Sequence, residues 1–153
     1  MKNLKDNIYV GLQLLLLIIF FFDYDIWKFE VPQLIEITAI IIGFIGGSIT
    51  ILALMQLGGS LSPFPSPKKN SELITSGLFR YVRHPIYTGI ILSTFSLSIF
   101  LGSSWKLGVS ILLMILFYLK SIYEEQKLAE KYPGYHFYRE NTGRFLPKMK
   151  EII

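Results

Sequence analysis

Four apolar stretches constrain the fold of this chain more than any other feature. They cover residues 8–22, 34–57, 86–101 and 107–123. A helix needs roughly 20 apolar residues to cross about 30 Å of hydrocarbon, so only the second stretch is comfortably long and the others recruit flanking residues. Of the 153 residues, 52% are hydrophobic and only 17% are charged, unlike a soluble domain. The pattern predicts an all-α, polytopic integral membrane protein with about four transmembrane helices, forming one domain over residues 1–153.

The charged residues predict an orientation. Residues 23–30 carry three acidic side chains and one lysine, whereas residues 58–85 carry four Lys or Arg residues and one acidic side chain. By the positive-inside rule the second loop is cytoplasmic, and four crossings then place both termini on that side. The net charge of +4 gathers beside apolar stretches, where basic residues meet lipid phosphates. We therefore expect a lipid bilayer, and no nucleic acid, as the partner; the oligomeric state stays open.

Metal and thiol chemistry find little support in the composition. The chain has no cysteine and only two histidines. Thiol catalysis and thiolate metal sites are therefore excluded, and two histidines alone do not make a convincing zinc or iron site. We expect no metal.

The segment "FRYVRHPIYTG", residues 79–89, gathers charge at the edge of the third apolar stretch. Pro85 disfavours helical backbone at His84 and is itself well placed in the first turn of the helix that follows. This geometry leaves the His84 imidazole free to face a ligand. The simpler alternative is that Arg80 and Arg83 only reach lipid phosphates, and the sequence leaves both roles open for these arginines.

An acidic pair, Glu124 and Glu125, ends the fourth stretch. A charge at the bilayer centre costs roughly 2.5–3.5 kcal/mol, so the pair should lie at the membrane interface. Because a tight turn joins the third and fourth stretches, the pair should also lie near His84. The alternative for Glu124 is a helix-surface pair with Lys120, four residues earlier.

The segment 132–148 alternates aromatic and basic residues. Pro133 and Gly134 should end the preceding helix, so that this tail can fold back over the charged junction. It could form a lid over a polar site or an aromatic belt at the membrane interface. The belt is the favoured interpretation for Tyr132 and Phe137.

These motifs together carry a family resemblance. "GLFRYVRHPIYTG", then "EEQKL" and finally "GRFLP", over residues 57–147, resemble the isoprenylcysteine carboxyl methyltransferase family and its phospholipid N-methyltransferase relatives. The resemblance implies S-adenosylmethionine as cofactor, in a cytoplasmic site formed by the loop and the C-terminal segment. It also implies catalytic roles for Glu124 and for Arg144, which would meet an anionic substrate. The implied cofactor-binding residues are His84, Pro85, Tyr87, Gly89, Glu124, Glu125, Tyr135 and Tyr138.

The family relatives also use small residues on the preceding helix. Here "GFIGG", residues 43–47, is a loose counterpart, and close helix packing is its favoured interpretation.

The resemblance favours one reaction among several. A site open to lipid would admit an acceptor with an acyl or prenyl tail. Methylation of a carboxylate by a sulfonium donor neutralises two opposite charges, which a dry site favours, and it needs no general base. A protonated amine must first lose a proton, so His84 or a glutamate would have to assist. We expect carboxyl O-methylation of an isoprenylcysteine-type acceptor, a lipophilic small molecule or prenylated substrate, with phospholipid N-methylation as the alternative.

Two other functions are weighed against methyl transfer. NADPH-dependent sterol-type reductases resemble this family near their C-termini, but they tend to have Asn and Glu where this chain has Ile86 and Ile90. The other is a non-catalytic membrane protein whose basic edge binds anionic lipid. Its binding would survive replacement of His84 or Glu125 by alanine.

Overall fold

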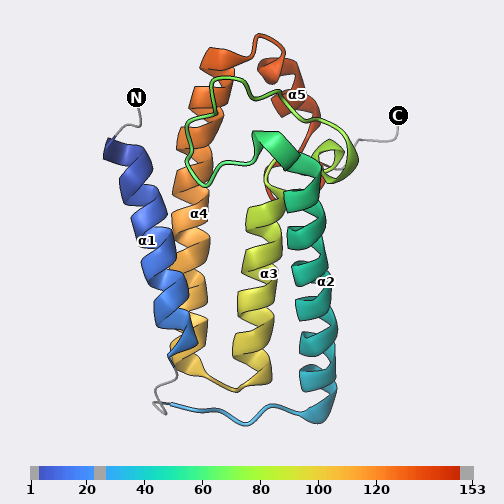
Figure 1. Cartoon of the computed structure of the whole chain (residues 1–153). Coiled ribbons are helices and arrows are strands. Elements are labelled where there is room, and N and C mark those ends of the chain that lie inside the picture. The colour runs from blue at the N-terminus through green and yellow to red at the C-terminus, as the bar shows by residue number, and fades with distance from the viewer. Residues whose placement is uncertain (1–3, 23–26, 149–153) are drawn as a thin grey trace.

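The computed structural model describes residues 4–22 and 27–148, and it contains no β-strand within those ranges. Four long helices stand side by side in the order α1, α4, α3, α2, and the short helix α5 lies at one end of the bundle (Figure 1). The all-α prediction is confirmed. The elements are α1 (Leu4–Phe21), α2 (Gln33–Leu57), the 3₁₀ turns η1 (Gly58–Ser60) and η2 (Gly77–Arg80), α3 (Pro85–Phe100), α4 (Ser104–Lys131) and α5 (Tyr135–Asn141).

Three helices, α1, α2 and α4, are long and apolar enough to span a membrane. The fourth, α3, is apolar but has only 16 residues. Large apolar side chains cover the outside of the bundle, and Phe44 and Met55 of α2 are 79% and 73% exposed. A surface of this kind suits lipid rather than water. A fourth crossing by α3, and the side of the membrane on which each end lies, stay predictions.

Local sequence sets the helix ends. Pro85 occupies the first turn of α3, where its missing N–H costs nothing. After α3 the chain turns at Gly102, whose φ of +56° favours glycine. The Ser103 hydroxyl then caps α4 by accepting from the backbone N–H of Lys106 at 3.3 Å. At its other end α4 stops at Lys131, because Pro133 forces the preceding residue into extended backbone.

Helices α2 and α3 approach closely through glycines. A Cβ atom built on Gly89 would lie 2.2 Å from the Thr50 hydroxyl and 2.5 Å from the Gly46 carbonyl. One built on Gly43 would lie 3.3 Å from a side chain of α3, whereas Gly47 has open space. The "GFIGG" segment therefore serves helix packing through Gly43 and Gly46, as expected.

The loop, α5 and the C-terminal segment gather at the end of the bundle where α1 begins and α4 ends (Figure 1). Residues 27–32, which lead into α2, and the turn that joins α3 to α4 lie at the opposite end (Figure 1). Between them lies an apolar cluster of Phe20, Val109, Leu113 and Phe117, against which Tyr87 packs. Polar and irregular backbone is thus concentrated at one end of the bundle.

Candidate functional site

His84 sits at the junction between the loop and α3, with φ of −125° and ψ of 61°. This non-helical backbone immediately before Pro85 confirms the sequence-based prediction. The C-terminal segment lies alongside: the N–H of Arg83 donates to the Gly143 carbonyl (2.8 Å), and that of His84 donates to the Arg144 carbonyl (3.1 Å). The tail therefore folds back onto the junction.

Glu125 binds the junction and the tail together. Its side chain is only 3% exposed and accepts from Arg83 Nε (3.1 Å), Arg144 Nε and Nη2 (3.0 Å each), and His84 Nε2 (3.2 Å). Because a carboxylate only accepts hydrogen bonds, this His84 tautomer carries its proton on Nε2. The hydrogen bonds to Glu125 raise the pKa of Arg144. Both oxygens of Glu125 are thus occupied by the protein itself.

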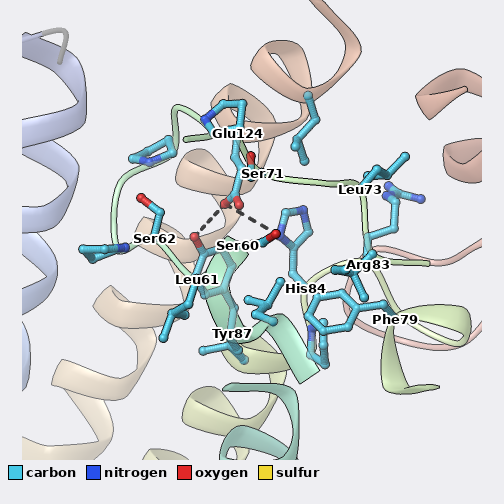
Figure 2. Close-up of a pocket in the computed structure, with 18 of the residues that line it drawn as sticks. Ser60, Leu61, Ser62, Ser71, Leu73, Phe79, Arg83, His84, Tyr87 and Glu124 are labelled. Atoms are coloured by element: carbon cyan, nitrogen blue, oxygen red, sulfur yellow. Dashed lines mark hydrogen bonds and ion pairs between the residues drawn. The ribbon is translucent and has the colours of Figure 1, made fainter. Parts of the chain in front are cut away.

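Glu124 points the other way, into a cavity. The Tyr87 hydroxyl donates to its Oε2 at 2.6 Å, and His84 Nδ1 lies 3.8 Å from the same oxygen. Its side chain is 25% exposed, against 3% for Glu125. Figure 2 shows the Glu124 carboxylate above Tyr87 and His84, whose rings stack with centroids 5.3 Å apart and planes at 3°. The predicted convergence of the acidic pair on His84 is confirmed.

The cavity has a volume of about 370 Å³, within the range of small-molecule sites. Helices α2, α3 and α4 and the loop 60–74 form most of its wall, and Ser60, Leu61 and Ser62 lie beside Tyr87 in Figure 2. Most of its surface is apolar. Its lining residues include Gln13, Thr50, Leu54, Leu57, Ser60, Leu61, Pro63, Leu73, Phe79, Arg83, His84, Pro85, Tyr87, Ile90, Lys120, Glu124, Leu128, Tyr132, Tyr135 and Tyr138.

Three tyrosines of the tail, Tyr132, Tyr135 and Tyr138, line the cavity. The Tyr138 hydroxyl donates to the Phe79 carbonyl (2.5 Å), and that of Tyr132 donates to the Ser71 carbonyl (2.6 Å). Burial raises the pKa of Tyr135 and of Tyr138. Tyr132 therefore contributes to the lid, contrary to the belt interpretation, because its hydroxyl finds a backbone partner in the loop.

The structure separates the residues that the sequence grouped as one site. His84, Pro85, Tyr87, Glu124, Tyr135 and Tyr138 line the cavity, whereas Gly89, Glu125 and Arg144 do not. Gly89 packs against α2 instead of facing the cavity. The Arg144 guanidinium forms an ion pair with Glu125. Arg83 also lines the cavity and is paired with Glu125, while Arg80 is exposed.

Lys120 and Gln13 line the cavity, and the sequence analysis assigned neither of them to the site. The Lys120 ammonium is buried and donates to Gln13 Oε1 on α1 (2.6 Å) and to the Pro63 carbonyl of the loop (2.9 Å). The helix-surface pair between Lys120 and Glu124, which was the alternative for Glu124, is not formed, because both side chains bind other partners. A lysine inside an apolar stretch was a signal for this site, since intramembrane charges usually serve function.

Comparison with known proteins identifies the family. The model of the phospholipid methyltransferase family matches residues 32–134, more than half of the chain. The chain belongs to this family. The match includes the junction and the acidic pair, and it ends before Tyr135, Tyr138 and Arg144. Membership and the apolar helices indicate an integral membrane protein.

A curated relative points in the same direction. The chain is 28% identical over 99 residues to a protein-S-isoprenylcysteine O-methyltransferase of Schizosaccharomyces pombe, which covers 62% of this chain. The aligned part spans 42% of that relative's length. The two comparisons thus match the two groups of proteins that the motifs resemble, the phospholipid methyltransferases and the isoprenylcysteine methyltransferases.

Proposed function

We propose that this protein transfers a methyl group from S-adenosylmethionine to a lipophilic acceptor, with carboxyl O-methylation of an isoprenylcysteine-type acceptor as the favoured reaction. The observation that carries the proposal is the cavity in which the Glu124 carboxylate, held by Tyr87, faces apolar walls and tyrosine rings. The name of the curated relative supports the choice of acceptor.

The residues present fit this cofactor. When bound, it supplies an electrophilic methyl group on a sulfonium cation. A carboxylate and electron-rich tyrosine faces stabilise such a cation, and Glu124, Tyr135 and Tyr138 offer both. The Glu124 carboxylate can also accept hydrogen bonds from hydroxyl or ammonium groups. Most of the cavity surface is apolar, which strengthens these interactions.

The remaining predicted site residues hold other groups in place. Glu125 fixes the His84 ring through Nε2, and Arg144 fixes the tail over the junction. Pro85 sets the start of α3, and Gly89 sets its distance from α2. We propose that the site lies at the cytoplasmic edge of the membrane, as the distribution of basic residues predicts.

The name of the curated relative supports a carboxylate acceptor over an amine. An amine acceptor needs a base, which His84 Nδ1 or the Glu124 carboxylate would have to supply. A carboxylate acceptor needs no base. Phospholipid N-methylation stays the alternative, because the matching family model carries that name.

Calorimetric titration of the purified protein tests the cofactor. We expect S-adenosylmethionine and S-adenosylhomocysteine to bind, and NADPH not to bind. Glu124→Gln should weaken both affinities by tenfold or more, since hydrogen bonds to a charged group are worth about 1.5–3 kcal/mol. Glu130→Gln, an exposed change on the same helix, should leave them unchanged. Absence of binding by the first two ligands, or tight binding of NADPH, would refute the proposal.

Transfer of a labelled methyl group tests the acceptor. The two substrates to compare are a farnesylcysteine analogue, which offers a carboxylate, and phosphatidylethanolamine, which offers an amine. Labelling of the farnesylcysteine analogue supports the favoured reaction. Labelling of phosphatidylethanolamine alone would establish the alternative.

A further inference from the structure

The cavity contains two opposite charges at different depths along α4. Lys120 precedes Glu124 by four residues, which is about 6 Å along a helix. The Tyr87 ring connects the two levels: its hydroxyl donates to Glu124, and its ring centroid lies 5.3 Å from Lys120 Nζ. A ligand in this cavity therefore meets a carboxylate nearer the loop end of the bundle and an ammonium deeper in the helices.

The Lys120 ammonium lacks a direct ion partner. Its side chain is buried, and its two acceptors, on Gln13 and Pro63, are both neutral oxygens. Within the part of the chain that the structure describes, no carboxylate lies within ion-pair distance, and Glu124 and Asp6 act on it only from farther away. An ammonium has three N–H donors, so one remains for a ligand. Burying such a charge without an ion partner is costly.

Gln13 supplies a second donor at the same place. Because Lys120 can only donate, the oxygen of the Gln13 amide must face it, and the amide NH₂ then points elsewhere. That NH₂ has no acceptor among residues 4–22 and 27–148, and Gln13 lines the cavity. The pair thus offers two kinds of N–H donor and one positive charge, which is the chemistry that binds an oxyanion.

We propose that Lys120 and Gln13 bind the carboxylate of the methyl acceptor and thereby set its specificity. This inference rests on the proposed methyltransferase function. It assigns the deeper level of the cavity to the acceptor and the level of Glu124 to the cationic donor. The ammonium of an amine acceptor would meet the like charge of Lys120 at the deeper level and is disfavoured there.

The same arrangement suits the course of the reaction. A carboxylate oxygen forms the new C–O bond as the donor's S–C bond breaks with its electron pair remaining on sulfur. No proton moves, and both charges disappear. The resulting ester is neutral and is held less tightly by Lys120 than the carboxylate was, which promotes product release.

The test compares head groups on one apolar tail. The protein, reconstituted in lipid nanodiscs and saturated with S-adenosylhomocysteine, is titrated with 3-(farnesylthio)propionate, its primary amide and the corresponding amine. We expect the carboxylate to bind the wild-type protein at least about tenfold more tightly than the other two. Equal binding of the three, or no binding of the carboxylate, overturns the proposal without recourse to any variant.

The variant Gln13→Glu sharpens the test. It keeps an oxygen for Lys120, so the link between α1 and α4 is retained, but it removes the amide donor and neutralises the site. We expect at least a tenfold loss of carboxylate affinity with little change for the amide. Gln126→Glu, the same change at an exposed position of α4, should have no effect. If the pair only ties the helices together, Gln13→Glu will leave carboxylate binding intact, which overturns the proposal.

S-adenosylhomocysteine separates the two proposals. Its affinity should be the same in the wild-type and Gln13→Glu proteins. If its affinity falls in Gln13→Glu instead, the pair holds the carboxylate of the donor, and the assignment to the acceptor is wrong. If it does not bind the wild-type protein, the methyltransferase function fails and this inference fails with it.

Discussion

Replacing Glu125 with glutamine should destabilise the protein more than any other single charge removal at this site. The carboxylate is 3% exposed and accepts from two guanidinium groups and one imidazole. Glutamine keeps one oxygen but presents an NH₂ group where a donor already points. Breaking a buried ion pair by removing one partner costs about 3–5 kcal/mol. For a chain of this size that corresponds to a fall in melting temperature on the order of 10 °C.

The assay is thermal unfolding of the detergent-purified protein, monitored by circular dichroism and by intrinsic fluorescence. The matched control is Glu130→Gln on the same helix, where the carboxylate is 64% exposed and pairs only with Lys127. Exposed pairs of this kind contribute little, so its melting temperature should not change measurably. A melting temperature for Glu125→Gln within 2 °C of the wild type would refute the reasoning.

A double-mutant cycle tests whether the cost arises from uncompensated charge. Arg144→Gln removes one of the cations that Glu125 neutralises. If the buried cations cause the loss, the double variant Glu125→Gln/Arg144→Gln should be more stable than the sum of the two single losses predicts. Strict additivity would show that the two residues act independently, against the geometry.

Two further predictions concern packing and pH. Gly89→Ala should lower the melting temperature by several degrees, because its methyl group would lie 2.2 Å from the Thr50 hydroxyl, whereas Gly108→Ala, which has open space on α4, should not. Burial raises the pKa values of Tyr135 and Tyr138 above the ordinary 10.0. The stability that the two neutral tyrosines contribute to the folded protein is therefore complete below pH 10 and is lost as the pH rises beyond it. Melting temperatures between pH 8 and 11 should therefore fall less steeply in Tyr138→Phe, and an unchanged slope would contradict the cause given.

Helix positions and the His84 junction followed from local sequence. The apolar stretches predicted all four long helices, and Pro85 predicted both the start of α3 and the extended backbone before it. These features depend on residues close together in the chain. The contacts of His84 with the two glutamates were also predictable, because a short turn between α3 and α4 makes the start of α3 and the end of α4 neighbours. The tail's return over the junction was foreseen only as one of two alternatives.

The roles of the two adjacent glutamates were not separable in the sequence. Neighbouring residues on a helix point about 100° apart, so the two side chains leave α4 in different directions. Which is which depends on the rotation of α4 against α3 and on where Arg144 docks.

The sequence by itself determined the membrane character of this protein, its helices, its charged junction and its family resemblance, because apolar length, proline geometry and motif spacing are properties of the chain. The tertiary structure decided which polar groups share the cavity. It brought Gln13 to Lys120 across 107 positions, folded the loop 60–74 over Tyr87 and turned Glu125 away from the cavity. Such contacts depend on how the helices pack and rotate, and no local pattern of residues specifies that.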